Sequence, residues 1–464
     1  MLRTFLVLAI IAFGLRHAVR GPFYAVLFYL WVAYFRPELW LWSDWLASIN
    51  LSFYVGVFAL LWGLLTFQLR WDLRILLTLL MVLQSLWSTL ASSWLALSWP
   101  YWVDFAKSIA ITWLLASLID TPAKFRTTLL VIGFSLGFET AKQGWLQLVL
   151  NPGGKNFNDI AFLGDNNGVA IGMLILCAIF VALARTAKTK GERWVHRFLS
   201  VGVLYRGIIT YSRGGFISAT VMGLLYFLRS KRKLAAAVGL VVVVGVIAPV
   251  LPNAFWERMG TLSLVSQSDD ERGRLTNEQS GDLESALSRF HFWKVAVQMA
   301  NDHPFTGVGH NAYMMAYDLY DSSHGKYGFG RAVHSSWFGV IGELGYPGIT
   351  LYLLIFALAL LSCRTARRVA TELPEATPLR EYAIALETSL IVIMVGGSFV
   401  TFQYSEMLWH IVGLSIALRR IAIEAQERAV VKTAEPAAWS PFMPLPSGAP
   451  APASGTAFYT LPKP

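Results

Sequence analysis

Three polar segments with the residue types for binding and activating a charged substrate interrupt an otherwise apolar chain. The first is Gly164-Asp165-Asn166-Asn167-Gly168. Asp and Asn are typical N-cap residues, so the segment is suited to start a helix at about residue 167. The same carboxylate and amides also suit a loop that faces a sugar or a phosphate. Both interpretations stay open, and Asn166 and Asn167 are candidate substrate-binding residues.

The second segment is Tyr211-Ser212-Arg213-Gly214-Gly215, between two apolar runs. We expect a very short hairpin whose glycines permit the turn. An arginine at such a place commonly extends toward lipid headgroups. Its planar fork of donors also matches phosphate oxygens, so Arg213 is a candidate anion clamp.

The third segment is Arg331-Ala332-Val333-His334-Ser335-Ser336, ahead of a helix that contains Glu343, Gly345 and Gly348. In one interpretation it caps this helix and His334 is simply hydrogen-bonded. In the other, His334 is a general base at the membrane boundary, because imidazole exchanges protons near neutral pH. No histidine pair has HExxH or similar spacing, so no zinc site is predicted.

The elements that hold these segments are predicted from composition. Of the 464 residues, 55% are hydrophobic and only 14% are charged. Soluble domains are roughly 25% charged, so a soluble enzyme, a disordered chain and a collagen-like fibre are excluded. The fold class is an all-α polytopic membrane protein. The 18 Trp, 17 Tyr and 29 Phe agree with aromatic belts at both membrane interfaces.

A spanning helix needs roughly 20 apolar residues. Candidate spans lie at 51–68, 73–95, 101–119, 126–150, 167–185, 195–211, 214–229, 233–251, 335–361, 381–400 and 404–419. Two shorter runs, 4–15 and 21–36, are either tilted spans or a re-entrant pair. The prediction is therefore about 12 transmembrane helices.

The net charge of +10 comes mainly from short loops, so it indicates topology and not nucleic-acid binding. Four basic clusters, at 185–197, 229–233, 364–380 and 419–432, fall on one side, which the positive-inside rule makes cytoplasmic. Residues 252–333 then form one long periplasmic loop, and the three polar segments face the same way. Within this loop Ser285–Ala300 has the spacing of a helix lying on the membrane surface.

Four regions follow: a transmembrane bundle at 1–251, the periplasmic loop at 252–333, transmembrane helices at 334–420 and a disordered cytoplasmic tail at 421–464. The tail holds 8 of the 19 prolines. Inside the membrane, two acidic–basic pairs are spaced i,i+3, Asp104 with Lys107 and Glu139 with Lys142. We expect the first pair to be structural, whereas the second is placed to line a cavity.

The order of these motifs resembles the superfamily of O-antigen ligases and Wzy polymerases, bacterial inner-membrane glycan enzymes. The resemblance rests on Asp165-Asn166-Asn167, Tyr211-Ser212-Arg213-Gly214, the series Arg289, Trp293, Asp302, Pro304, Gly307 and Gly309, and His334-Ser335 followed by Glu343, Gly345 and Gly348. The N-terminal Pro22-Phe23-Tyr24 and Tyr34-Phe35-Arg36-Pro37 look like the O-glycosylation ligases associated with exosortase systems.

The resemblance implies a GT-C-type glycosyltransferase in the inner membrane, with its active site facing the periplasm. Its donor would be a glycan on undecaprenyl pyrophosphate and its acceptor a hydroxyl of lipid A–core, with no metal or other cofactor. Arg213 and Arg289 would then stabilise the leaving pyrophosphate. His334 would take the acceptor's proton in a single inverting displacement. Arg331 is a further substrate-binding candidate.

Three alternatives remain. A Wzy-like polymerase would use a second lipid-linked glycan as acceptor, and an O-glycosylation ligase would use a protein hydroxyl. A transporter of lipid-linked glycans would place broken helices and ionisable residues near the midplane, with internal repeats. The chain has no recognisable repeat, and its polar segments gather at one end of the helices.

Overall fold

The computed structural model describes residues 2–41, 48–66, 68–156, 158–253, 255–256, 259, 277–373 and 376–434. This part of the chain is helical, and its only β-type pairing is an isolated bridge between Ile160 and Gly164. The first half contains α1 (Leu2–Ala18), α2 (Pro22–Phe35), η1 (Pro37–Trp40), α4 (Leu51–Leu65), α5 (Leu73–Ala91), α6 (Leu95–Leu118), α7 (Pro122–Leu150) and α8 (Asn166–Arg185). The second half contains α9 (Lys190–Ile208), α10 (Arg213–Arg229), α11 (Lys233–Ile247), η2 (Ala248–Val250), α14 (Asn277–Asp302), α15 (Tyr313–Tyr320), α16 (Ser336–Glu372), α17 (Thr377–Gly396) and α18 (Glu406–Ala434).

Each apolar run predicted from the sequence coincides with one of these helices. Three described helices, α5, α8 and α16, are long and apolar enough to cross a membrane, and α2 and α4 are shorter apolar helices. These helices, in a described part of the chain that contains no strand, indicate a membrane protein. The figure of about 12 spans stays a prediction.

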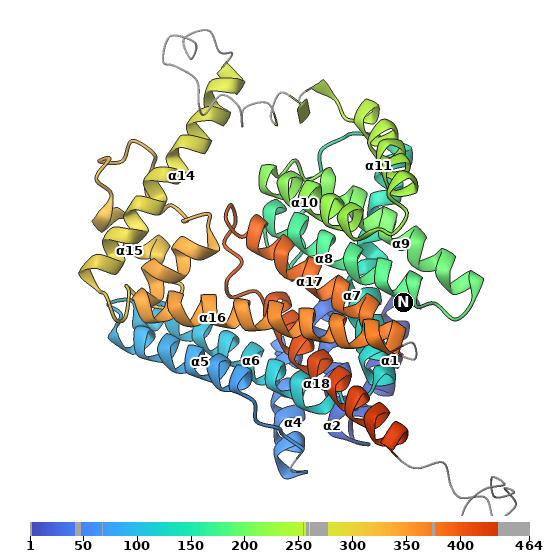
Figure 1. The fold of residues 1–464 in the computed structure, drawn as a ribbon. Coiled ribbons are helices and arrows are strands. Elements are labelled where there is room, and N and C mark those ends of the chain that lie inside the picture. The colour runs from blue at the N-terminus through green and yellow to red at the C-terminus, as the bar shows by residue number, and fades with distance from the viewer. Residues whose placement is uncertain are drawn as a thin grey trace, which may run out of the picture.

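Helix α16 runs through the middle of the molecule, with α5 and α6 along one side and α17 and α8 along the other (Figure 1). The candidate span in α8 is 89% buried within the protein, so other helices surround α8 on nearly all sides. Helices α14 and α15 stand at one end of α16 (Figure 1). Both helices lie within the predicted long loop. Helix α14 contains the predicted Ser285–Ala300 helix and extends beyond it at both ends.

A break in α16 fixes the position of the α14–α15 segment. Gly345 has φ 67° and ψ −168°, and Pro347 follows it. The carbonyls freed at the break accept hydrogen bonds from outside the helix, as irregular backbone at membrane depth requires. Val308 N donates to Gly342 O at 3.0 Å, and Gln84 Nε2 donates to Leu344 O at 2.9 Å. The 303–309 turn is thereby docked onto the broken helix.

The basic clusters meet at the other end of the bundle. Glu387 on α17 pairs with Arg229, Arg364 and Arg367, at 3.0, 3.3 and 3.5 Å, and Glu381 pairs with Arg185 at 3.0 Å. Two carboxylates of one helix therefore join three of the four predicted clusters. The proximity of these three clusters agrees with the prediction that their loops lie on the same side of the membrane.

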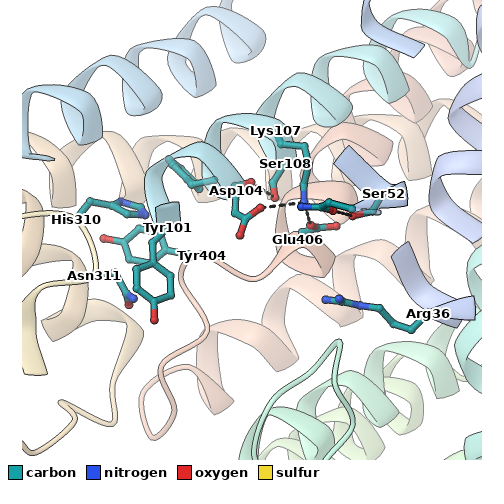
Figure 2. Close-up of a pocket in the computed structure, with 12 residues that line it drawn as sticks. Arg36, Ser52, Tyr101, Asp104, Lys107, Ser108, His310, Asn311, Tyr404 and Glu406 are labelled. Atoms are coloured by element: carbon teal, nitrogen blue, oxygen red, sulfur yellow. Dashed lines mark hydrogen bonds and ion pairs between the residues drawn. The ribbon is translucent and has the colours of Figure 1, made fainter. Parts of the chain in front are cut away.

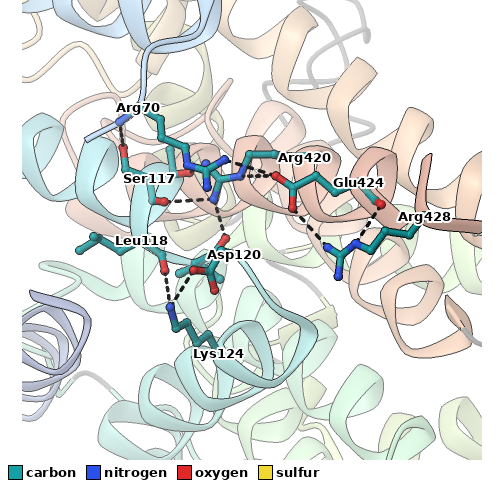
Figure 3. A network of polar contacts seen from close by, with 10 residues as sticks. Arg70, Ser117, Leu118, Asp120, Lys124, Arg420, Glu424 and Arg428 are labelled. Atoms are coloured by element: carbon teal, nitrogen blue, oxygen red, sulfur yellow. Dashed lines mark hydrogen bonds and ion pairs between the residues drawn. The ribbon is translucent and has the colours of Figure 1, made fainter. Parts of the chain in front are cut away.

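The fourth cluster closes the same bundle from α18 (Figure 3). Arg420 donates to the carbonyls of Ala116 and Ser117 in the last turn of α6, at 2.7 and 3.1 Å, and to that of the C-cap residue Ile119 at 2.8 Å. A cation at a helix C-terminus satisfies these carbonyls and complements the helix dipole. Arg428 pairs with Glu424 one turn away at 3.4 Å.

The start of the C-terminal tail differs from the prediction. The composition predicted a disordered tail from residue 421, whereas α18 continues to Ala434. Residues 421–434 include four Ala and two Glu, which favour helix, and Glu424–Arg428 adds an i,i+4 pair. The proline-rich remainder, 435–464, lies outside the described residues.

Candidate functional site

All six residues predicted to form the site line one cavity of about 770 Å³. It is enclosed by the starts of α8 and α10, by α14 and by the segment that precedes α16. The predicted members are Asn166, Asn167, Arg213, Arg289, Arg331 and His334; the others are Asp165, Glu284, Ser288, Phe292, Gly325, Lys326, Tyr327 and Gly328. Segments more than 100 residues apart thus meet, as the predicted topology implies.

The loop before α8 joins two helix starts. Asp165 is the N-cap of α8 and accepts from the backbone N–H groups of Asn167 and Gly168 at 3.1 and 2.9 Å, so its structural interpretation is confirmed. The amide of Asn166 donates to Thr210 O at 3.2 Å. Asn167 accepts from the hydroxyl of Ser212, the N-cap of α10, at 2.8 Å. The two asparagines therefore hold the segment that carries Arg213.

The turn before Arg213 differs from the prediction in one respect. Gly214 and Gly215 were expected to permit the hairpin, but they lie within α10, and the left-handed residue is Tyr211 with φ 58°. A Cβ on Gly215 would lie 2.5 Å from the Cβ of Ala170, so the glycine permits close packing of α10 on α8. Tyr211 is held by its hydroxyl, which donates to Gly153 O at 2.8 Å. A left-handed tyrosine is uncommon and often marks a functional site.

Helix α14 brings Arg289 to the cavity from the opposite side. Its apolar face forms a small core with α15 and the segment before α16. Trp293 stacks on Phe338 of α16 with ring centroids 5.1 Å apart, and the hydroxyl of Tyr313 donates to Phe292 O at 2.7 Å. These contacts orient α14, so that Arg289 and Phe292 both reach the cavity wall.

A glycine-rich loop at 321–331 covers part of the cavity and was missed by sequence reasoning. Asp321 organises it, accepting from His291 at 2.7 Å and from the backbone of Ser323 and Gly325 at 2.8 and 2.7 Å. Burial raises the pKa of Asp321, but these hydrogen bonds outweigh burial and hold the pKa well below its usual value. Gly325, Gly328 and Gly330 all have positive φ. The run His324-Gly-Lys-Tyr-Gly-Phe-Gly330 was the available signal.

This loop places Tyr327 and Arg331 at the cavity. The ring of Tyr327 packs against that of His291 at 5.2 Å. The guanidinium of Arg331 donates to Tyr327 O and is otherwise exposed. Arg331 is therefore at the rim, whereas Arg213 is only 5% exposed.

His334 is left-handed, with φ 49°, and half-buried beside the ring of Phe292 at 6.4 Å. Ser335, not His334, is the N-cap of α16. Among the described residues, none hydrogen-bonds to this imidazole, so it does not fit the interpretation of a hydrogen-bonded capping histidine. Burial, then the charges of Arg289 and Arg331, lower its pKa, and Asp165 opposes them. The imidazole is therefore neutral at pH 7 and able to accept a proton.

Three helices, α8, α10 and α16, begin within two residues of a cavity-lining residue. The first turn of a helix presents unpaired N–H groups and a partial positive charge, which favours anions. With Arg213, Arg289 and Lys326 in the wall, the cavity is suited to a phosphate or pyrophosphate group. A neutral imidazole at the same cavity adds a proton acceptor.

Residues 198–353 match the family model described as O-antigen ligase, and residues 1–188 match a family of unknown function. The first match contains Arg213, Arg289, Arg331 and His334, and it confirms the predicted kinship with the O-antigen ligase superfamily. It supports a ligase-type function on lipid-linked glycans in general terms. No curated protein matches the chain.

The two acidic–basic pairs predicted inside the membrane are both present. Lys107 lies 3.2 Å from Asp104, and Lys142 lies 2.6 Å from Glu139. Glu139, but not Lys142, lines a cavity of about 350 Å³, so the expectation for that pair holds for one of its two residues. Lys107 and Asp104, predicted to be structural, also line a separate pocket.

Proposed function

We propose that this protein is an O-antigen ligase of the GT-C type in the bacterial inner membrane, with its active site facing the periplasm. It transfers a glycan from undecaprenyl pyrophosphate to a hydroxyl of lipid A–core without a metal ion. The observation that carries the proposal is that Arg213, Arg289 and His334 line one cavity. The match of residues 198–353 to the O-antigen ligase family supports it.

In the proposed step, the acceptor hydroxyl attacks the anomeric carbon of the donor while His334 takes its proton. The bond between the anomeric carbon and the pyrophosphate oxygen breaks, and the oxygen leaves with the electron pair. A single displacement of this kind inverts the anomeric centre. The low pKa of His334 keeps the imidazole in the accepting form.

The developing negative charge on the pyrophosphate needs fixed positive groups, because these require no reorganisation during the reaction. Arg213 and Arg289 supply it in the proposal, and Arg331 at the rim adds to it. Asn166 and Asn167 contribute by holding the start of α10 against α8. The lipid tail of the donor remains among membrane lipids beside the apolar helices.

Reconstitution tests this proposal. Purified full-length protein in nanodiscs receives undecaprenyl-pyrophosphate glycan and lipid A–core, with EDTA present. We expect a mass increase of lipid A–core equal to the glycan, with inverted anomeric configuration. Growth of longer glycans on the lipid carrier would instead indicate a polymerase. Absence of transfer to lipid A–core, with transfer to a periplasmic protein, would indicate an O-glycosylation ligase.

A further inference from the structure

A second polar pocket, of about 330 Å³, lies where α6 and α18 meet the segment between α14 and α15. Figure 2 shows Asp104 and Lys107 of α6 together with Glu406 of α18 on one side, and Tyr101, His310, Asn311 and Tyr404 on the other. Its volume is in the range of small-molecule sites, about 300–1,000 Å³. The proposed transfer step uses none of these residues.

The charged side chains of this pocket are paired with one another. Lys107 lies 3.2 Å from both Asp104 and Glu406, and Arg36 at the edge pairs with Glu38 at 3.6 Å. The hydroxyl of Tyr29 also donates to Glu406, at 3.0 Å. These paired groups form a surface dense in hydrogen-bond donors and acceptors.

His310 is a polar group that the fold satisfies only in part. Its side chain is 0% exposed and interacts with the backbone of Tyr101, and neither ring nitrogen makes a well-formed hydrogen bond to a described residue. Burial lowers the pKa of His310 to about 3, so the ring is neutral and has one donor and one acceptor. Because a poorly satisfied buried polar group is costly, a hydrogen bond from a ligand in this pocket would be favourable.

Aromatic rings form the remaining wall. The ring of Tyr404 lies 4.0 Å from that of His310, and Phe105 lies 5.3 Å from Tyr404. Tyr101, 53% exposed, stands at the opening. Carboxylates and amides that can bond paired hydroxyls, beside aromatic faces that pack against ring C–H groups, suit a neutral polyhydroxylated ring.

One loop links the pocket to the segment that carries His334. Ser336, two residues after His334, donates to Val400 O at 2.9 Å and accepts from Phe402 N at 2.9 Å. The same loop continues to Tyr404 and Glu406, which line the pocket.

We propose that the pocket formed by Tyr101, Asp104, His310, Tyr404 and Glu406 binds one sugar ring of a substrate glycan. The sugar chemistry rests on the pocket alone. Its assignment to the donor or to the acceptor rests on the proposed function. The two sources are distinguished by two soluble probes, namely the core oligosaccharide released from lipid A and the glycan released from its lipid pyrophosphate.

The test is saturation-transfer NMR on the full-length protein in nanodiscs with each probe. Tyr101→Ala removes an exposed ring, and Asp104→Asn removes one carboxylate while Lys107 keeps Glu406. Tyr54→Ala and Asp120→Asn are the matched controls: Tyr54 is 62% exposed, and Asp120 pairs with Lys124 at 2.8 Å at the far end of α6. We expect one probe to bind wild type and both controls, and Kd to rise about tenfold in each pocket variant.

His334→Asn separates this proposal from the transfer reaction. We expect it to bind the probe as wild type does, because His334 is not part of the pocket. If neither probe bound wild-type protein at millimolar concentration, or if the pocket variants bound as the controls do, the sugar pocket would be refuted. If His334→Asn retained transfer while Tyr101→Ala lost probe binding, the role of His334 as general base would be refuted and the sugar-binding pocket would be supported.

Discussion

The hydroxyl of Ser212 donates a 2.8 Å hydrogen bond to the side-chain oxygen of Asn167 and so ties the start of α10 to the start of α8. The same hydroxyl accepts from Gly215 N at 3.1 Å as the N-cap of α10. Arg213, the first residue of α10, directly follows Ser212 in the chain and lies within the turn that the Ser212–Gly215 hydrogen bond closes. The position of a buried guanidinium is thus set by a side chain 46 residues earlier.

This relationship predicts that Asn167→Ala lowers the rate of transfer without changing the oligomer or the yield of folded protein. We expect kcat to fall about tenfold, because one hydrogen bond that positions Arg213 is lost. Ser212→Ala breaks the same contact, so the double variant is expected to lose less than the product of the two single losses. Fully multiplicative losses would show that the contact does not act through Arg213. Asn301→Ala, on α14, is the control.

Arg213→Lys and Arg289→Lys test the need for a planar fork of donors. Each substitution keeps the charge but replaces a bidentate contact to phosphate by a point charge. We expect kcat/KM for the lipid-linked donor to fall about tenfold or more in each variant. Arg193→Lys, at an exposed position on α9, is expected to leave it unchanged. If the site variants and the control had equal kcat/KM, neither Arg213 nor Arg289 would contact the donor phosphate.

The pH profile reports on His334. A base with a lowered pKa is already deprotonated at pH 7, so kcat/KM should be flat above its ordinary value of 6.5 and fall only at lower pH. Arg331→Gln removes one charge that lowers this pKa. The acidic limb should therefore move to higher pH in this variant, and the rate at pH 5.5 should fall relative to wild type. An unchanged limb in Arg331→Gln would contradict the assignment.

Gly345→Ala tests the break in α16. Gly345 has φ 67°, and a Cβ there would lie 2.5 Å from Pro304 O. We expect a loss of about 1–3 kcal/mol of stability from the strained backbone, seen as a lower melting temperature in detergent. Gly239→Ala in α11, where no atom lies within 4 Å of the added Cβ, is expected to be neutral or slightly stabilising. Equal melting temperatures would contradict the structural role of the break.

Hydrophobic runs were sufficient to predict the helices, because apolar segments of this length are stable only as helices in a membrane. The shared cavity of Arg213, Arg289 and His334 could be predicted from the expected topology, which places all three next to helix ends on one side of the bundle. The role of Tyr211 could not, because its left-handed backbone depends on the distant carbonyl of Gly153. Sequence spacing carries no information about such a contact.

The second pocket was beyond sequence reasoning for a related reason. Asp104 and Lys107 form an i,i+3 pair on one helix, which the sequence reveals. Glu406 and His310 come from segments about 300 and 200 residues further on, and only the packed bundle brings them to that pair. The extension of α18 past residue 421 was missed because the proline-rich remainder dominated the composition of the tail.

The central claim is tested most directly by transfer to lipid A–core in His334→Asn. Asparagine tolerates the left-handed backbone of this position but cannot act as the base, so folding is preserved while proton transfer is removed. We expect the rate to fall by about 10²–10⁴, whereas His303→Asn, at an exposed position before the 303–309 turn, should retain it. A folded His334→Asn protein that transfers glycan at the wild-type rate would contradict the account.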